Sequence, residues 1–126
     1  MALTHIALAC VPVRDPDKAL EFYRDVLGFE VLSDDVLEED HRWIQLRPVG
    51  SLTTIALVTW FPSMPAGSVR GLVLATDDID ADTDALRTRG LDLPTEIESA
   101  AWGRWVSFSD PDGNGWVLQG PPEQPS

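Results

Sequence analysis

The chain has little cysteine, few basic residues and no long apolar run. Its single cysteine, Cys10, excludes an intramolecular disulfide, and a lone thiol in an apolar segment is typical of a small core residue. The 9 Lys and Arg against 21 Asp and Glu give a net charge of −12, which repels nucleic acid and anionic lipid. Without a run long enough to span a bilayer, we expect no membrane segment. Without a charged and then apolar leader, we expect a cytoplasmic protein.

What the chain does contain is an internal repeat. Its repeated pieces are Asp15-Pro16-Asp17 before a helical pattern and Gly28, which recurs as Asp78-Ile79-Asp80 before Gly90, then Arg42-Trp43 and Arg104-Trp105, and finally Ile55-Ala56-Leu57 and Trp116-Val117-Leu118. The order of the pieces is the same in both halves. One β-α-β-β-β unit written twice predicts pseudo-twofold symmetry and a cleft between the halves.

We therefore expect an α+β fold in which two tandem βαβββ modules form a curved mixed sheet around a cleft, with the helices on the outer face. The chain of 126 residues is expected to make one domain. Module one is expected over residues 1–61, a proline-punctuated connector over 62–68, module two over 69–120 and a frayed tail over 121–126.

Local signals place the expected elements. Asp15 and Asp78 are expected to cap helices that end at Gly28 and Gly90. The expected strands are 5–13, 30–32, 42–47 and 53–60 in module one, and 69–75, 91–93, 104–108 and 115–119 in module two. The acidic residues within 34–40 are expected to form a solvated loop, and 110–115 a tight turn before the last strand.

Two of these segments resemble a known family. Residues 15–29, with Phe22-Tyr23 at their centre, look like the first helix of the vicinal oxygen chelate superfamily, and the turn Asp110 to Asn114 looks like its last hairpin. This superfamily contains glyoxalase I, extradiol dioxygenases and bleomycin-resistance proteins, and the resemblance covers nearly the whole chain. It implies the duplicated fold and a homodimer. It does not imply one function, because the superfamily contains both metal enzymes and metal-free binders.

The resemblance also locates the positions that hold a metal in many members, in the first and last strands of each module. These positions fall on Leu8, Ala56, Gly71 and Val117. None of the four has an imidazole nitrogen or a carboxyl or amide oxygen with which to bind a divalent cation. We therefore predict no metal site, no cofactor and no catalytic residue.

The two histidines leave alternatives open. His5 lies an odd number of residues from Leu8, so on one strand the two side chains point to opposite faces. His41 shares parity with Trp43 and is either a surface histidine or a general acid/base that faces the cleft. An enzyme with the displaced ligands His5, His41 and Glu39, acting as a lyase, isomerase or dioxygenase, is the alternative to a metal-free binder.

Strand alternation then predicts which side chains line the cleft. The candidate ligand-binding residues are Leu8, Trp43, Gln45, Ala56, Trp60, Gly71, Trp105, Ser107, Val117 and Gln119, with Trp102 in a loop where it can close over the opening. The opposite parity makes Trp116 mostly a core residue. Three tryptophans in one cavity indicate a flat aromatic ligand, although tryptophan is also typical of subunit interfaces, and both interpretations stay open.

The sequence as a whole predicts a metal-independent binder of a small aromatic molecule, resembling bleomycin-resistance-type sequestration proteins, within a homodimer. Its partners would be that molecule and a second copy, with no nucleic acid and no membrane. Two alternatives stand beside it: a glyoxalase-like metal-dependent enzyme, and an interaction module whose cleft is filled by its partner subunit. Swapped and unswapped pairings of the modules both fit the sequence.

Overall fold

The computed structural model describes residues 1–38 and 41–123. Module one contains β1 (Leu8–Pro12), α1 (Pro16–Glu21), the π-helical turn η1 (Phe22–Val26), β2 (Glu30–Glu38), β3 (His41–Arg47) and β4 (Thr54–Val58). Module two contains β5 (Leu72–Ala75), α2 (Ile79–Thr88), β6 (Glu98–Ala100), β7 (Gly103–Ser109) and β8 (Gly115–Gly120). None of the described helices is long and apolar enough to cross a membrane.

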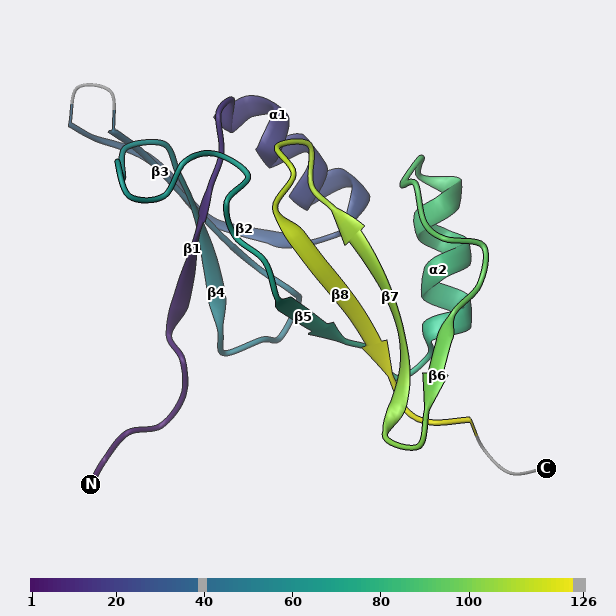
Figure 1. The fold of residues 1–126 in the computed structure, drawn as a ribbon. Coiled ribbons are helices and arrows are strands. Elements are labelled where there is room, and N and C mark those ends of the chain that lie inside the picture. The colour runs from purple at the N-terminus through teal and green to yellow at the C-terminus, as the bar shows by residue number, and fades with distance from the viewer. Residues whose placement is uncertain (39–40, 124–126) are drawn as a thin grey trace.

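Each module forms its own four-stranded mixed sheet (Figure 1). The strand order is β1-β4-β3-β2 in module one and β5-β8-β7-β6 in module two. In both sheets the first strand runs parallel to the last, and the remaining neighbours are antiparallel. The repetition of one topology in both halves confirms the predicted α+β fold of two tandem modules.

The helices begin where the sequence predicts. The Asp15 side chain accepts hydrogen bonds from the backbone of Asp17 and Lys18, and Asp78 accepts one from Ala81. After Glu21 the first helix widens into η1, where the Leu27 amide donates to the Phe22 carbonyl at 3.1 Å. The π-helical turn is a feature that the sequence pattern did not indicate.

Two strand predictions are wrong. The segment 34–38, expected as an acidic loop, belongs to β2, whereas residues 39–40 lie outside the described residues. Because β2 is an edge strand with mostly exposed side chains, it tolerates carboxylates that a central strand would exclude. The segment 91–93 is not a strand, and β6 forms later, at Glu98–Ala100. Leu93 is nevertheless buried, so its apolar character reflects packing in the core rather than strand pairing.

One hydrophobic core joins the two modules on the helix side of both sheets. Ring centroids of Phe22 and Phe108 lie 6.5 Å apart, and those of Tyr23 and Trp116 lie 5.8 Å apart. Figure 1 shows why these contacts form, since α1 lies beside the hairpin between β7 and β8. The prediction that Trp116 is a core residue is confirmed by its exposure of 3%.

A buried polar network, the inter-module joint, lies within this core and links the two halves. The Tyr23 hydroxyl donates to Asp110 Oδ2 at 2.6 Å, and Trp116 Nε1 donates to that hydroxyl at 3.0 Å. Asn114 Nδ2 donates both to Asp110 Oδ2 and to the Pro12 carbonyl, each at 2.8 Å. Among the described residues every buried polar side-chain atom has a partner, so the joint is fully satisfied.

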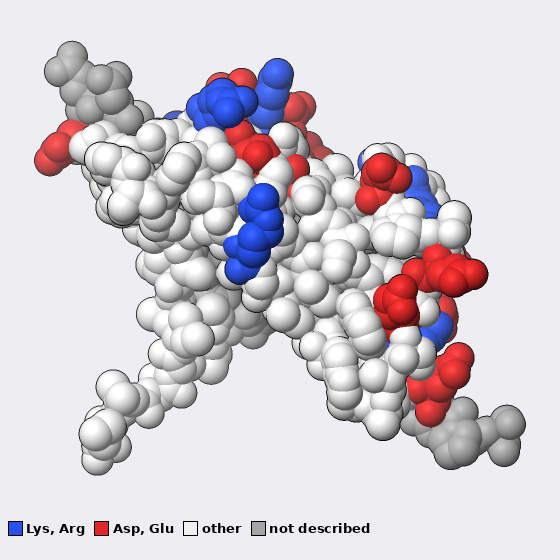
Figure 2. Space-filling view, in the orientation of Figure 1, with Lys and Arg blue, Asp and Glu red and all other residues white. Residues whose placement is uncertain are grey.

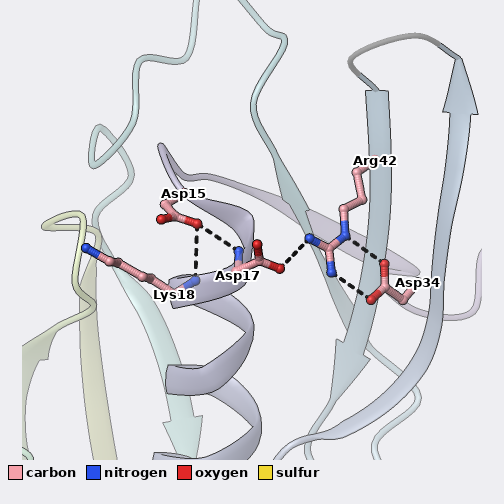
Figure 3. Close-up of polar contacts among 5 residues, drawn as sticks. All are labelled: Asp15, Asp17, Lys18, Asp34 and Arg42. Atoms are coloured by element: carbon pink, nitrogen blue, oxygen red, sulfur yellow. Dashed lines mark hydrogen bonds and ion pairs between the residues drawn. The ribbon is translucent and has the colours of Figure 1, made fainter.

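The internal symmetry extends to ion pairs that attach each helix to its sheet. The Arg42 guanidinium donates to Asp17 at 2.7 Å and to Asp34 at 2.9 Å (Figure 3). In module two Arg104 donates to Asp80 at 2.8 Å. Asp17 and Asp80 both lie in the first turn of a helix, so the repeated Asp and Arg of the sequence correspond to one repeated contact.

Candidate ligand-binding site

Strand alternation separates each sheet into a core face and a face without helices. In β3, Ile44 and Leu46 are completely buried on the core face, while Trp43 and Gln45 lie half-buried on the other. In β7, Val106 is buried and its neighbour Trp105 is half-buried on the opposite face. We refer to these second faces as the helix-free faces, and the structure places Trp43 and Trp105 on them as the sequence predicts.

The helix-free face of module one carries an aromatic cluster, which consists of His41, Trp43, Trp60 and Phe61. His41 and Trp60 are stacked, with ring centroids 4.8 Å apart and planes inclined by 25°. Trp43 lies 6.4 Å from Trp60, and Phe61 lies 5.7 Å from it. Trp60 follows the end of β4, so it reaches the cluster from a loop. His41 is part of the cluster because its ring stacks on that of Trp60.

A chain of hydrogen bonds fixes the tryptophan of module one. Trp43 Nε1 donates to Gln45 Oε1 at 3.0 Å, and Gln45 Nε2 donates to Thr54 Oγ1 at 2.9 Å. The Thr54 hydroxyl in turn donates to the Ala7 carbonyl at 3.2 Å. These hydrogen bonds hold the Trp43 ring in one orientation. They also occupy the polar atoms of Gln45, which would otherwise be available to a ligand.

Module two carries a second aromatic pair. Trp102 and Trp105 are stacked, with ring centroids 4.8 Å apart and planes inclined by 14°. Trp102 lies in the turn between β6 and β7 and is 60% exposed, so one face of the stack is open to solvent. Ser107 and Gln119 also lie on the helix-free face, and neither side chain forms a hydrogen bond with another described residue.

The apolar residues of the predicted site are Leu8, Ala56, Gly71 and Val117, of which Ala56 is completely buried. Gly71, Ser107 and Val117 line one open hollow of about 330 Å³ in module two. Leu8 and Ala56 lie on neighbouring strands of module one, where Leu8 is paired with Thr54 and Ala56 with Cys10. Burial raises the pKa of the Cys10 thiol, which favours its protonated form.

The two aromatic groups are separate within one chain. Across residues 1–38 and 41–123, no aromatic contact joins Trp43 or Trp60 to Trp102 or Trp105. A smaller cavity of about 130 Å³ does lie between the modules, but its lining includes Ile55, Leu72 and Trp116 rather than the predicted tryptophans. A single chain therefore presents two half-sites instead of one cavity lined by three tryptophans.

The charge distribution distinguishes the two sides of the molecule. In Figure 2 the acidic and basic side chains gather along α1 and α2, while the hollowed underside next to the amino-terminal arm shows few charges. The arm, residues 1–7, is exposed along its length and carries the apolar side chains Met1, Leu3 and Ile6. This sparsely charged underside leaves apolar surface available for contact.

No metal centre is assembled by the described residues. They contain no group of three or more His, Cys, Asp and Glu side chains placed to hold an ion. His5 is exposed in the arm and shares a hydrogen bond with Thr4, and His41 Nδ1 lies 3.6 Å from Glu38 Oε2. Glu39, the third alternative ligand, lies outside the described residues. The absence of a metal cofactor stays a prediction.

Two further residues lie on the helix-free faces and were not predicted from the sequence pattern. Asp35 of β2 is paired directly with Trp43, and Glu98 of β6 is paired directly with Trp105. Both were missed because their segments were not expected to be strands. Asp35 and Glu98 can be identified only from the register of the β2–β3 and β6–β7 pairs, which requires the positions of β2 and β6 to be known.

Comparisons with known proteins agree with this architecture. A family model described as "Glyoxalase/Bleomycin resistance protein/Dioxygenase superfamily" matches residues 2–118. The crystal structure of TnmS3, an antibiotic binding protein from Streptomyces sp. CB03234, is 46% identical, covers 96% of this chain and 98% of that chain, and has a TM-score of 0.90. A superfamily member from Sphaerobacter thermophilus is 34% identical, covers 95% and 99% of the two chains, and has a TM-score of 0.85. The protein YetH of Bacillus subtilis is 28% identical over 93% of this chain and 98% of its own.

Proposed function

Because the chain belongs to the Glyoxalase/Bleomycin resistance protein/Dioxygenase superfamily, we propose that it binds a flat aromatic molecule and sequesters it without a metal ion. The observation that carries the proposal is the presence of an aromatic group on the helix-free face of each module. The 46% identity to TnmS3, an antibiotic binding protein, supports the same class of function. We infer small-molecule binding from this likeness, and we infer that the ligand is aromatic from the tryptophans of this chain.

The proposed site is completed by a second copy of the chain. The two aromatic groups do not meet within one chain, and in the described sheets β1 and β5 each have an edge without a partner strand. Exposed apolar side chains lie next to these edges, among them Ile6 at 71% and Val73 at 54%. Such edges and apolar patches are typical of association surfaces. A twofold homodimer brings module one of each copy opposite module two of the other.

Each module would contribute different contacts to the ligand. Trp43 and Trp60 supply one aromatic wall, and the stacked pair Trp102 and Trp105 supplies the other. Leu8, Ala56, Gly71 and Val117 provide an apolar floor without metal donors. Ser107 and Gln119 provide free hydrogen-bonding groups, whereas Gln45 already binds Trp43 and Thr54. Stacking therefore supplies affinity, and module two fixes the orientation.

Binding is measured most directly by quenching of the intrinsic fluorescence of the 5 tryptophans. Titration with 1,8-dihydroxyanthraquinone is expected to give saturable quenching with one ligand per chain. Trp43→Leu and Trp105→Leu are each expected to weaken binding about fivefold, since an aromatic stack contributes about 1 kcal/mol beyond its buried area. Val49→Ala, at an exposed apolar position in the loop after β3, is the matched control and leaves the affinity unchanged.

The same preparations test the alternatives. Sedimentation velocity is expected to give a dimer, and metal analysis is expected to find less than one tenth of an equivalent of transition metal per chain. A full equivalent of bound metal, lost in His41→Ala, would favour the glyoxalase-like enzyme. Quenching that is absent in a dimer with buried tryptophans would favour the interaction module. A cytoplasmic location also stays a prediction, checked by fractionation of the source cells.

A further inference from the structure

The sheet register places a carboxylate beside the central tryptophan of each half-site. Asp35 is directly opposite Trp43 in the β2–β3 pair, and Glu98 is directly opposite Trp105 in the β6–β7 pair. Directly opposed residues of antiparallel strands project from the same face, with Cβ atoms roughly 5 Å apart. The two carboxylates therefore lie on the helix-free faces, next to the indole rings.

Unlike Glu30 and Asp34 of β2, these two carboxylates form no ion pair with an arginine or lysine of the described residues. Glu30 of β2 lies opposite Arg47 of β3 and forms an ion pair with it at 3.4 Å. Asp34, on the core face of β2, is paired with Arg42 at 2.9 Å. In the described part of the chain, neither Asp35 nor Glu98 forms an ion pair or a side-chain hydrogen bond, and both are exposed.

The arrangement is repeated in both modules although the surrounding residues differ. Asp35 lies in a strand of nine residues and Glu98 in one of three, yet each is opposite the tryptophan that follows an arginine. That arginine, Arg42 or Arg104, turns to the core face and binds a helix carboxylate there. Each half-site thus pairs an indole face with an uncompensated negative charge, while the neighbouring positive charge is neutralised on the other side of the sheet.

We infer that Asp35 and Glu98 are specificity-determining residues, and that the aromatic ligand of this protein is a planar cation. This inference rests on the function proposed above and specifies the class of ligand. A cationic ring stacked on an indole gains from the ring quadrupole, and a carboxylate at the ring edge adds a direct ionic contact. The same carboxylates repel an anionic ring of equal size. Charge therefore discriminates between ligands that stacking alone would bind equally.

Three planar tricyclic probes separate the effect of charge from that of stacking: proflavine as the cation, 1,8-dihydroxyanthraquinone as the neutral compound and anthraquinone-2-sulfonate as the anion. At pH 7 and low salt, proflavine is expected to bind at least tenfold more tightly than anthraquinone-2-sulfonate. The ratio is expected to shrink several-fold in 0.5 M NaCl, because exposed charges are screened. Equal affinities for the cation and the anion would overturn the inference.

Variants assign the effect to the two residues. Asp35→Asn and Glu98→Gln are each expected to weaken proflavine binding three- to tenfold and to change the affinity for the neutral probe less than twofold. Glu21→Gln and Asp92→Asn remove the same charge from exposed positions outside the helix-free faces and are expected to have no effect. Equal losses in all four variants would overturn the inference, because they would reflect net charge alone.

The outcomes distinguish this inference from the function on which it rests. If the neutral probe binds but Asp35→Asn and Glu98→Gln leave proflavine binding unchanged, the aromatic binding site is supported and the proposed role of the two carboxylates in cation selectivity is rejected. If none of the three probes quenches tryptophan fluorescence, the aromatic binding function itself falls, and the inference falls with it. Far-ultraviolet circular dichroism of each variant confirms that the exposed substitutions leave the fold intact.

Discussion

Replacement of Tyr23 by Phe tests how the two modules are held together. The Tyr23 hydroxyl occupies the centre of the inter-module joint, where it donates to Asp110 and accepts from Trp116. Its side chain is completely buried, so no water can replace the lost oxygen without a rearrangement of the core. Tyr23→Phe preserves the aromatic packing and removes only these two hydrogen bonds.

The expected cost follows from the partners that remain. Loss of a buried hydrogen bond to a carboxylate costs about 2 kcal/mol, and an unsatisfied buried indole N–H costs about 1.5 kcal/mol. Asp110 keeps its hydrogen bonds from Asn114 and from the turn backbone, so it is not left without partners. The free energy of unfolding of Tyr23→Phe is therefore expected to fall by about 3.5 kcal/mol at pH 7.

Alkaline pH gives the same substitution a second, independent signature. Burial, and then the nearby carboxylate of Asp110, raise the pKa of Tyr23 well above its usual range. Above pH 10 the unfolded chain loses the phenolic proton while the folded chain keeps it, so the stability of the wild type falls with rising pH. By pH 11 this loss is about 1.4 kcal/mol, and Tyr23→Phe cannot show it. The difference between the two proteins is thus expected to shrink to about 2 kcal/mol.

Urea unfolding at pH 7 and pH 11, monitored by circular dichroism, measures both quantities. Because Tyr23 is the only tyrosine, absorbance at 295 nm reports its ionisation directly, and no tyrosinate is expected to form in the folded protein at pH 11. A cost below about 0.5 kcal/mol at pH 7, or tyrosinate formation near pH 10 without unfolding, would contradict the role of the Tyr23 hydroxyl in the inter-module joint.

Two further substitutions test the backbone and the ion pairs. Gly67→Ala is expected to cost well over 2 kcal/mol in urea unfolding, because Gly67 has a φ of 81° and an added Cβ would lie 2.1 Å from the Asp112 carbonyl oxygen. Gly50→Ala, with a φ of 84° and open space around it, is the control and should cost about 1 kcal/mol. The free energy of unfolding of Arg42→Met is expected to be about 1 kcal/mol lower than that of the wild type at neutral pH. Hydrogen bonding to Arg42 lowers the pKa of Asp34, so the unfolded chain takes up a proton before the folded chain does as the pH falls below about 4. The stability advantage of the wild type over Arg42→Met is therefore expected to shrink as the pH falls from there. A stability difference that stays constant from pH 7 to pH 3 would contradict this.

Features that depend on neighbouring residues were predicted correctly from the sequence, whereas features that depend on distant segments were not. Helix caps at Asp15 and Asp78 were predicted correctly because a cap is decided by neighbours within one turn. Strand parity placed Trp43 and Trp105 correctly because alternation is a local property of an extended backbone. By contrast, β2 was predicted too short, because its charged residues are acceptable only at the edge of a sheet, and edge position is not written in the segment itself.

The candidate site was predicted only in part, for the same reason. Gly71, Ser107 and Val117 were expected on one surface and do line one hollow. The expectation that Trp43, Trp60 and Trp105 share a cavity required knowledge of how the modules pack, and within one chain they form separate groups. Asp35 and Glu98 were missed because their relation to the tryptophans depends on strand register, which is set between segments.

The duplicated sequence was enough to predict two βαβββ modules, the starts of their helices and the faces on which Trp43, Trp105 and Trp116 lie, because caps and alternation depend on residues a few positions apart. How the modules pack is visible only in the folded chain, where the helix sides of both sheets share one core and the aromatic groups of the two modules stay separate among the described residues. Tyr23 and Trp116 come from different modules, and they gain their burial and their shared hydrogen bond only when the two modules pack together. No pattern within either segment contains that contact.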